Sequence, residues 1–402
     1  MEGEILFLAH RIPFPPDRGD KIRSFHLLEA LRGIAPVHVG CFADDARDMG
    51  FADDLAALTA SQCVVMRNRS RLVAGLDGLI GRKPMLVALY ESARLRRWVA
   101  ETLRERPIRA IVIFSVQMAR FVPHDLPPGV RFVMDFVDFD SAKYAAYGAD
   151  QRSLMGWINR REGRLLLDFE REVAARADVS TFVSAAESAV FAEASGLDHE
   201  RFRVLENGVD LNYFNAQSAI PKIDHNHPLI VFTGQMDYRP NVEAVASFAR
   251  EAFPTIRHVH PGAAFAIVGR NPAREVQGLA AEPGVIVTGG VPDVRGWLAA
   301  ADVVVAPLRI ARGIQNKVLE AMAMGKPVVA SAEAAEGIDA RHGEHLIVAN
   351  GPGEEAQAVL ALLADPARAA ELGRAARARV EERYDWAATL APLRAMLTGA
   401  AS

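Results

Sequence analysis

The chain has 402 residues, of which 50% are hydrophobic and 24% charged, a globular composition that excludes a mostly disordered or fibrous protein. The 46 Lys and Arg against 50 Asp and Glu give a net charge of −4, which argues against a dedicated nucleic-acid-binding protein. Two cysteines, Cys41 and Cys63, are too few for a disulfide framework and favour a reducing compartment. The first residues lack the basic and apolar regions of a signal peptide, and no apolar run approaches the roughly 18 residues of a spanning helix. We therefore expect a cytoplasmic protein.

Short apolar runs rich in β-branched residues alternate with longer helical patterns along the chain. Continuous apolar strands are typical of parallel sheets that are buried on both faces. Their alternation with helices predicts right-handed βαβ units. The expected strands are Ile5–Ala9, Val37–Phe42, Cys63–Met66, Ala110–Phe114, Phe132–Asp135, Val179–Val183, Phe202–Leu205, Leu229–Thr233, Ala264–Val268, Val285–Val287, Val303–Ala306, Val328–Ala330 and Leu346–Val348.

The strand series restarts after a polar segment, residues 215–228, that contains two prolines and is typical of a linker. We predict an α/β protein with two doubly wound, Rossmann-like domains that face a central cleft. The first domain is expected over residues 1–214 and the second over residues 215–383, followed by a C-terminal segment over residues 384–402. Because open parallel sheets bind ligands at the carboxyl ends of their strands, the loops that follow the strands are the candidate site.

The loop after the first strand is long and contains three prolines. Gly19 lies close to the start of the next helix, where unpaired backbone N–H groups can approach a phosphate or a sugar. We assign Gly19 and Asp20 to the acceptor side of the cleft. The loop lacks the G-x-G-x-x-G fingerprint, which argues against dinucleotide binding. The alternative is a rigid turn before a capped helix.

An acidic loop follows the strand Phe132–Asp135. Asp138 and Asp140 form a D-x-D pattern, which in some nucleotide-sugar enzymes holds a divalent metal. Asp135 and Asp138 are the candidate catalytic residues, because a carboxylate there can orient a sugar hydroxyl or accept a proton. Asp140 can instead cap the next helix. We predict that no metal is bound.

Two further loops are candidates for the cleft. Gly234 permits a tight exit from the strand Leu229–Thr233, Arg239 follows it, and Asn241 lies near a helix expected to begin around Val242. Asn207 belongs to an Asn-Gly turn just before the linker, and we place it at the cleft floor. Both segments can alternatively be plain connecting loops.

The most informative segment is residues 307–327, which follows a buried strand. Gly313 is expected to open a helix whose N-terminal N–H groups and dipole hold a diphosphate, and Lys317 lies one turn further on. Glu320, three residues later, lies on the same face and can accept hydrogen bonds from ribose hydroxyls. Arg309 and Arg312 add positive charge. The alternative is a plain ion pair between Lys317 and Glu320.

At these residues the chain resembles GT-B glycosyltransferases of the family 4 group. The residues that carry the resemblance are the helix over 313–323, Asn207–Asp210 and Tyr384–Trp386. The first loop and residues 235–241 are similar to the sugar transferases of PEP-CTERM/exosortase exopolysaccharide systems. The resemblance implies transfer of a sugar from a UDP- or GDP-linked donor to a glycan or polyprenyl-linked acceptor, with retention at the anomeric carbon and without a metal or cofactor. It also implies that the C-terminal helix returns to the first domain.

The chain departs from this family at one motif position. The E-x7-E motif has its second Glu at Glu320, but Arg312 occupies the first position, where the family's carboxylate contacts the donor sugar. This departure leaves open a non-catalytic nucleotide-sugar-binding protein. A nucleotide-sugar epimerase on the same fold is a second alternative, but it would need paired acids and bases in the cleft, and no such pair stands out.

Residues 66–109 carry 11 Arg or Lys and four acids, a local balance of 11 − 4 = +7. Apolar side chains are interleaved with these charges. The segment predicts peripheral contact with an anionic membrane surface or a lipid-linked acceptor. The alternative is solvated arginines on helix faces.

Overall fold

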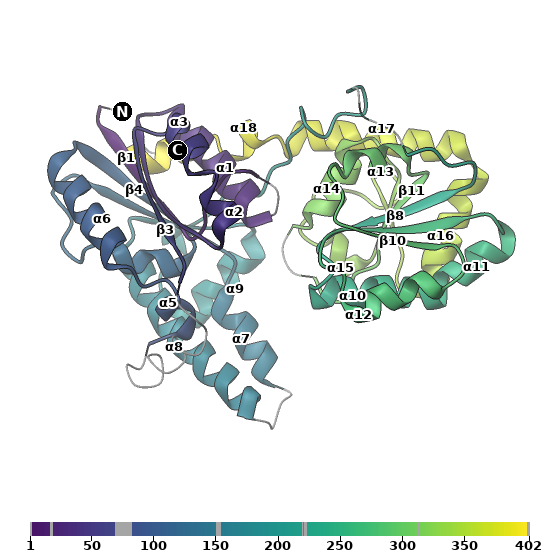
Figure 1. The fold of residues 1–402 in the computed structure, drawn as a ribbon, viewed down its shortest axis with the longest axis horizontal. Helices are drawn as coiled ribbons and strands as arrows, with labels where there is room; N and C mark the ends of the chain where they lie inside the picture. Colours follow the sequence, from purple (N-terminus) through teal and green to yellow (C-terminus); the bar gives the residue numbers. More distant parts are fainter. Residues whose placement is uncertain are drawn as a thin grey trace. The chain divides into compact units, whose positions relative to one another are not determined.

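The computed structural model describes residues 2–16, 19–68, 83–149, 154–218, 220, 223–311 and 314–399. The chain divides into two compact units (Figure 1). Unit 1 comprises Met1–Glu206 and Leu390–Ser402, and unit 2 comprises Asn207–Thr389.

Unit 1 is built on a seven-stranded parallel sheet with the order β3-β2-β1-β4-β5-β6-β7. The order reverses at β1, which lies between β2 and β4. The elements are β1 (Glu4–Ala9), α1 (Gly19–Arg32), β2 (Val37–Ala43), α2 (Ala46–Met49), α3 (Ala52–Leu58), β3 (Ser61–Met66), α5 (Met85–Ala88), α6 (Ala93–Glu105), β4 (Ile108–Phe114), η1 (Val116–Phe121), β5 (Arg131–Val137), α7 (Asp140–Ala149), α8 (Leu154–Arg176), β6 (Val179–Phe182), α9 (Ala185–Ser195), η2 (His199–Arg201), β7 (Phe202–Val204) and α19 (Leu393–Thr398).

The core of unit 1 explains why its strands are continuous apolar runs. Every residue of β2 is buried, as are residues 5–9 of β1, because helices cover both faces of the sheet. Under β5 and β6 the core is aromatic. The rings of Phe136 and Phe182 are stacked with centroids 5.2 Å apart, and Phe191 packs 5.0 Å from Phe182. Such pairs add packing energy beyond the area that they bury.

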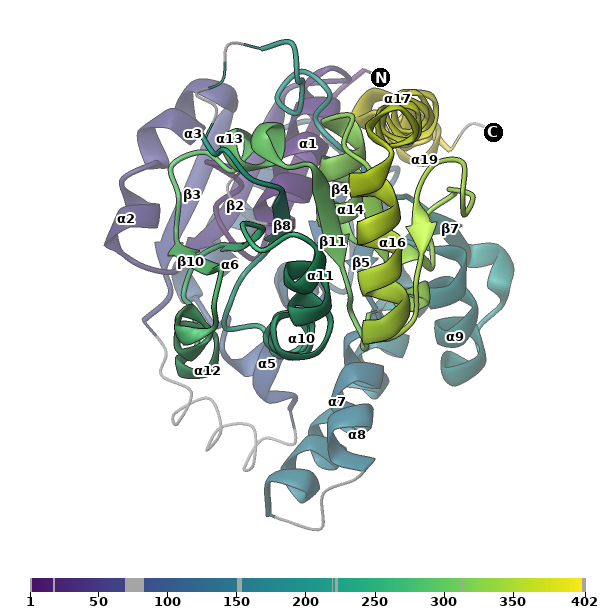
Figure 2. The ribbon, with the colours of Figure 1, turned by 90° about the vertical axis from the view of Figure 1, so that its right-hand side faces the viewer.

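Helices α7 and α8 form a hairpin that extends beyond the sheet (Figure 2). Small residues allow the two helices to pack closely. A Cβ atom added to Gly163 would lie 3.2 Å from the nitrogen of Ala145, and one added to Gly148 would lie 2.7 Å from Cγ of Arg160. The glycines of this hairpin are therefore needed for packing.

Unit 2 is built on a six-stranded parallel sheet with the order β10-β9-β8-β11-β12-β13. The elements are β8 (Leu229–Thr233), α10 (Arg239–Ser247), η3 (Phe248–Ala252, a π-helical turn), α11 (Phe253–Val259), β9 (Ala264–Val268), α12 (Arg274–Gly278), η4 (Leu279–Ala281), β10 (Val285–Gly289), α13 (Arg295–Ala300), β11 (Val303–Ala306), α14 (Asn316–Ala323), β12 (Val328–Ala330), α15 (Ala332–Ala335), β13 (Ile347–Val348), α16 (Pro352–Ala364), α17 (Pro366–Arg383) and α18 (Trp386–Thr389). The strands β8 and β11 lie at its centre and are buried throughout.

Unit 2 begins before the expected boundary at 214/215 and ends after the one at 383/384. The cause is the packing of two short segments against each other. The backbone N–H of Val209 donates to the carbonyl of Tyr384 over 2.7 Å, and a Cβ on Gly208 would lie 2.7 Å from the Trp386 ring. Phe214 is buried in the core of unit 2. The segments 207–210 and 384–386 therefore hold one another inside this unit.

The last helix, α19, belongs to unit 1, where it packs against β5. Its backbone is anchored by Arg131 of β5, whose Nε donates to the carbonyl of Met396 over 3.0 Å. Leu393 and Leu397 are buried at this contact.

The two-sheet α/β architecture predicted from the sequence is confirmed, and each expected strand is present. In the described part of the chain, no helix combines the length and the apolar character needed to cross a bilayer.

Candidate functional site

The strand order of unit 2 reverses between β8 and β11. The chain leaves β8 toward β9 on one side, and β11 leads to β12 on the other, so the loops after β8 and β11 diverge. Such a switch point opens a crevice at the carboxyl edge of a parallel sheet. The helices that follow these two strands, α10 and α14, bring Asn241 and Lys317 together there.

Lys317 is a half-buried cation with a neutral partner. Its Nζ donates to Oδ1 of Asn241 over 2.5 Å and lies 4.8 Å from the centroid of the Phe232 ring. Burial lowers the pKa of Lys317 to about 8, although the nearby Glu320 opposes this shift. Binding of an anion next to this ammonium group is favourable, because the anion stabilises the charged form that burial disfavours.

Glu320 lies three residues beyond Lys317 on α14. Burial raises the pKa of its carboxyl group to about 7, against the opposing effect of Lys317. Among the described residues, no hydrogen bond to this carboxyl and no ion pair between it and Lys317 are formed, although Lys317 acts on it electrostatically, so a plain ion pair does not describe this part of the structure. Glu320 is therefore positioned to accept hydrogen bonds from a ligand.

Other polar atoms at this edge also lack partners among the described residues. Oγ1 of Thr233, at the end of β8, and Oδ1 of Asn316, at the start of α14, are buried without a hydrogen bond. Buried polar atoms in folded proteins are almost always paired, so such orphans indicate a site that a ligand or water completes.

Gly234 and Asn241 set the spacing of the crevice. A Cβ on Gly234 would lie 2.8 Å from Nδ2 of Asn241, so a side chain at this position would displace the amide. Asn241 donates from Nδ2 to the carbonyl of Gln235 over 2.8 Å while its Oδ1 accepts from Lys317. The glycine expected to permit a tight exit from β8 thus also allows a close approach between the loop and α10.

Two helix starts differ from those expected. α14 begins at Asn316 rather than Gly313, which puts Lys317 at its second position, and α10 begins at Arg239 rather than near Val242. Proline in the first turn of α10 explains the earlier start, because proline suits the first turn of a helix. Arg312 and Gly313, two of the predicted donor-binding residues, lie outside the described residues.

The other predicted cations of unit 2 are at the surface. The Arg239 side chain is 75% exposed and forms an ion pair with Glu243 over 2.7 Å. Arg309 is exposed and donates from Nη2 to Oγ of Ser247 over 2.8 Å. The structure thus brings Lys317, Glu320 and Gly234 together and leaves Arg239 on the outer face of α10.

In unit 1 the structure gives Asp135 a role other than the one expected. Asp135 is 1% exposed, and its carboxylate accepts from Nε and Nη2 of Arg23 over 2.9 and 3.1 Å. Its Oδ1 also accepts from Oγ1 of Thr181 over 3.0 Å. The prediction of Asp135 as a catalytic residue is therefore corrected, because a carboxylate buried and bonded in this way holds α1 to the sheet and cannot meet a substrate.

Asp138 lies on the partly exposed loop after β5. Nζ of Lys143 donates to Asp138 over 2.8 Å and to Asp140 over 3.0 Å, so an ammonium group occupies the space between the two D-x-D carboxylates. Burial opposes the charge of Lys143, but the two carboxylates raise its pKa. Val137, just before this loop, has φ 70°, a strained backbone for a β-branched residue. Among the described residues, no group of three or more metal-binding side chains is arranged to hold a metal ion.

Three predicted residues remain. Gly19 and Asp20 lie just beyond the carboxyl end of β1, and Asn207 lies where the chain passes from unit 1 to unit 2. Gly19 is the exposed first residue of α1. Asp20 accepts from Arg11 and lies 3.1 Å from Nε2 of His10. Asn207 is the half-buried first residue of unit 2.

The sequence pattern did not identify Asn241 and Phe232 as the neighbours of Lys317. Asn241 was singled out from the sequence as lying near a helix start, but its contact with Lys317 joins two segments that only the fold brings together. Phe232 lies in an apolar strand, where nothing distinguishes it from a core residue.

Residues 227–365 match the family described as Glycosyl transferases group 1. The chain is 31% identical over 270 residues to the GDP-mannose-dependent alpha-(1-6)-phosphatidylinositol monomannoside mannosyltransferase of Mycolicibacterium smegmatis, which spans 61% of this chain and 68% of that relative. It is 32% identical over 132 residues to the phosphatidyl-myo-inositol mannosyltransferase of Propionibacterium freudenreichii, 32% of each chain.

Solved structures share the fold. Sucrose-phosphate synthase of Thermosynechococcus elongatus superposes with a TM-score of 0.70 at 19% identity over 100% of both chains. HepE of Anabaena, in complex with UDP-glucose, superposes with a TM-score of 0.66 at 18% identity over 99% of this chain and 100% of that one. These structures are GT-B-like, in agreement with the two-sheet architecture.

Proposed function

The chain belongs to the glycosyl transferases group 1 family, and from this premise we propose that it transfers a sugar from a nucleoside-diphosphate sugar with retention at the anomeric carbon. The observation that carries the proposal is the state of Lys317, a half-buried cation that, among the described residues, contacts an amide and an aromatic ring. A diphosphate is the ligand that such a cation at the start of a helix favours most.

In this proposal the donor is held by chemistry that unit 2 supplies. Lys317 and the first N–H groups of α14 balance the diphosphate charge, which grows as the bond to the sugar breaks. Glu320 accepts hydrogen bonds from the ribose hydroxyls, and Asn241 holds Lys317 in place. We propose no resident cofactor and no metal, because the ammonium of Lys317 supplies positive charge where a metal would.

The nucleotide and the acceptor are proposed from relatives. One relative is named as GDP-mannose-dependent, and one structural neighbour was solved with UDP-glucose, so UDP and GDP are the two nucleotides to test. Two relatives are named for phosphatidylinositol acceptors. A lipid-linked acceptor, such as a polyprenyl-linked glycan, is therefore our proposal for this chain, with a role in exopolysaccharide synthesis.

The binding test uses calorimetric titration of the full chain with UDP and GDP. We expect one of them to bind, and Glu320→Gln to weaken that binding by about 1.5–3 kcal/mol, the range for a hydrogen bond to a charged group. Lys317→Met should weaken it further, since it removes the charge. Glu344→Gln, in an exposed ion pair of the same unit, is the matched control. Unchanged affinity in folded Glu320→Gln and Lys317→Met would overturn the assignment.

The catalytic test separates transfer from the two alternatives. A transferase consumes the donor only when an acceptor is present, an epimerase interconverts the donor alone, and a binding protein does neither. Transfer that stops with a chelator and returns with Mn²⁺ or Mg²⁺ would overturn the metal-free mechanism and would make Asp138 and Asp140 candidate ligands.

We further propose that unit 1 contacts an anionic membrane surface, where a lipid-linked acceptor would lie. Within the basic segment, residues 69–82 lie outside the described residues, and α6 carries exposed arginines, of which Arg96 pairs with Glu91. The α7–α8 hairpin exposes Tyr147, Met155 and Trp157 at 51%, 58% and 47%. Exposed aromatic and arginine side chains suit a bilayer interface.

Co-sedimentation with vesicles tests this contact. We expect binding to anionic vesicles at low salt and little binding to neutral ones, because each basic residue near the surface contributes about 1 kcal/mol. The variants Arg96→Glu/Arg97→Glu and Trp157→Ser should each reduce binding without changing nucleotide affinity. Equal binding to neutral and anionic vesicles, or none to either, would remove the idea.

A further inference from the structure

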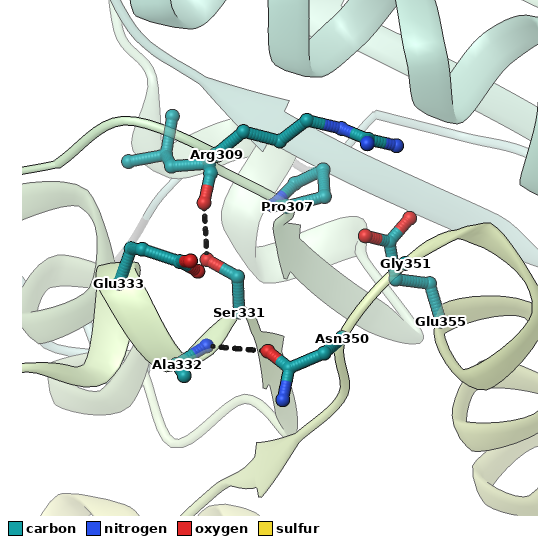
Figure 3. A pocket seen from close by; sticks show the side chains of 9 residues that line it. Pro307, Arg309, Ser331, Ala332, Glu333, Asn350, Gly351 and Glu355 are labelled. Atoms are coloured by element: carbon teal, nitrogen blue, oxygen red, sulfur yellow. Dashed lines mark hydrogen bonds between the residues drawn. The ribbon is translucent and has the colours of Figure 1, made fainter.

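A pocket of about 340 Å³ lies at the carboxyl edge of the sheet of unit 2 (Figure 3). Its walls are the segments 307–309, 331–333 and 350–351, which follow β11, β12 and β13, together with Glu355 of α16. The volume falls within the range of small-molecule sites, about 300–1,000 Å³. The segment that lines it after β11 continues into α14, the helix that carries Lys317.

Glu355 is a buried carboxyl group without a hydrogen-bond partner among the described residues. The residue is 4% exposed, its Oε2 is buried without a hydrogen bond, and no hydrogen bond to its side chain is formed within the described part of the chain. Figure 3 shows the carboxyl group turned into the pocket on the side of Arg309. Burial raises its pKa to about 7, while Arg309 opposes the shift and Glu251 adds to it.

The other polar groups of the wall are fixed in place. Oδ1 of Asn350 accepts from the backbone N–H of Ala332 over 3.0 Å, which leaves its Nδ2 as a hydrogen-bond donor. Ser331 donates to the carbonyl of Leu308 over 2.5 Å and accepts from the N–H of Ala334 over 3.1 Å. The pocket is therefore held in shape without Glu355.

The pocket offers the chemistry of a sugar-binding site. Glu355 accepts hydrogen bonds from hydroxyl groups, and Asn350 and Arg309 can donate to ring or hydroxyl oxygens. Pro307 and Leu308 supply apolar surface for the C–H face of a pyranose ring. A buried carboxyl group without a hydrogen bond lowers the stability of the folded protein. A hydroxyl group of a ligand that donates to it would form the missing hydrogen bond and so bind favourably.

The pocket and the proposed diphosphate site lie at the same edge of one sheet. Lys317 lies over the switch between β8 and β11, and the pocket opens beyond β11 and its neighbour β12. The loop after β11 lines the pocket and leads on to α14, which carries Lys317, so one connecting segment joins the two places.

We propose that this pocket holds the sugar ring of the nucleoside-diphosphate sugar, with Glu355 accepting a hydrogen bond from one of its hydroxyl groups. The proposal rests on the function proposed above and deepens it, because it assigns to this chain a sugar subsite formed by α16 and the loops after β11, β12 and β13. Glu355 is thereby a residue that determines which sugar is accepted.

Calorimetric titration of the full chain tests the subsite with UDP, GDP, UDP-glucose, UDP-N-acetylglucosamine and GDP-mannose as the probes. We expect at least one sugar nucleotide to bind more tightly than its free diphosphate. In Glu355→Gln this advantage should fall about tenfold, the value of one charge-assisted hydrogen bond, with the diphosphate affinity unchanged. The neighbouring Glu354→Gln is the matched control, since Glu354 is exposed and bonded to the backbone N–H of Asn350.

A second variant fills the pocket and does not touch its carboxyl. Ala332 lines the pocket at the start of α15, and Ala332→Phe should abolish the sugar advantage while the diphosphate still binds. Equal effects of Glu355→Gln on diphosphate and sugar nucleotide, or no effect on either, would overturn the subsite. A wild-type chain that binds none of these nucleotides would overturn the proposed function and the subsite with it, whereas diphosphate binding without a sugar advantage would overturn the subsite alone.

Discussion

The two sheets of this protein carry buried charges at their carboxyl edges, but the charges are arranged in opposite ways. In unit 1 two buried cations are paired with carboxylates, Arg23 with Asp135 and Lys21 with Asp48, whose Nζ and Oδ1 are 2.7 Å apart, and the buried carboxyl of Glu170 accepts from Oγ of Ser141 over 2.5 Å. In unit 2, Glu355 is buried and Lys317 and Glu320 are half-buried, and partial or full burial shifts the pKa of each toward the neutral form.

This difference in pairing is our basis for proposing that the buried charges of unit 1 stabilise the fold and that those of unit 2 bind a ligand. In a buried pair such as Arg23 and Asp135 each charge compensates the other, so the loss of one partner leaves a buried charge without compensation. An unpaired buried charge lowers stability, and a protein keeps one where a ligand is to pair with it. Burial alone therefore does not mark a functional residue. The partner of the buried group decides, and on this ground we propose a structural role for Asp135 and a ligand-binding role for Glu320.

The largest effect is expected where the pairing of unit 1 is broken. Asp135→Ala leaves the guanidinium of Arg23 buried without its carboxylate, which should lower the free energy of unfolding by about 3–5 kcal/mol. Denaturant titration of the purified chain measures it. Asp138→Ala is the control, because that carboxylate is 39% exposed and its pair with Lys143 should contribute at most about 1 kcal/mol. Equal losses in the two variants would contradict the distinction between the buried pair of Asp135 and the exposed pair of Asp138.

In unit 2 the corresponding change should stabilise the protein. The pKa of Glu355 is about 7 in the folded chain and near 4.5 when unfolded, so the folded state binds the proton more tightly and stability falls as pH rises between these values. Glu355→Gln removes this fall. We expect the variant to be more stable than the wild type by about 1–3 kcal/mol at pH 8 and equally stable near pH 4.5.

Thermal unfolding across this pH range measures the effect in the absence of nucleotide. A variant that is less stable at pH 8 would mean that the carboxylate of Glu355 already has a stabilising partner. The two units would then not differ in the way described.

The sequence predicted the fold far better than the pairing of its charges. Apolar strands such as Val303–Ala306 are a local pattern, and a parallel sheet follows from their alternation with helices. The Lys317–Glu320 spacing also follows from helix geometry. By contrast, Arg23 and Asp135 are far apart in the chain, and only the fold brings them together. No local pattern distinguishes a paired aspartate from a free one.

The same limit explains why Glu355 was not predicted. It lies in the first turn of α16 next to Glu354, and acidic residues are common there because they complement the helix dipole. Its burial depends on the loops after β11 and β12, which lie elsewhere in the sequence. Helix starts were misplaced for a related reason, since Gly313 and Val242 were judged from local residues alone.

The pH dependence of nucleotide binding sharpens the comparison at Lys317. Its pKa is about 8 in the free protein, and a bound diphosphate raises it, so binding requires the protonated form. Affinity should be about half its pH 7 value by pH 8 and should then approach a tenfold fall per pH unit, as the free lysine loses its proton. Titrations from pH 7 to 9.5 measure this. Lys317→Arg keeps its charge and should flatten the profile, whereas a flat profile in the wild type would mean that Lys317 does not pair with the diphosphate.

The smallest effect is expected for Arg131, a charged residue of unit 1 that bonds to the backbone of α19. Arg131 anchors α19 through the carbonyl of Met396, and Arg131→Met removes this hydrogen bond while it keeps the apolar stem. We expect a loss of about 0.5–1.5 kcal/mol, the usual value of one hydrogen bond. Hydrogen exchange should be faster in Leu393–Thr398 and unchanged in the strands of unit 2. Arg104→Met is the control, because Arg104 is 67% exposed and pairs with Glu105 at the surface. Unchanged exchange in α19 would show that buried Leu393 and Leu397 hold the helix without the arginine, and the structural role of charge in unit 1 would then be limited to its buried pairs.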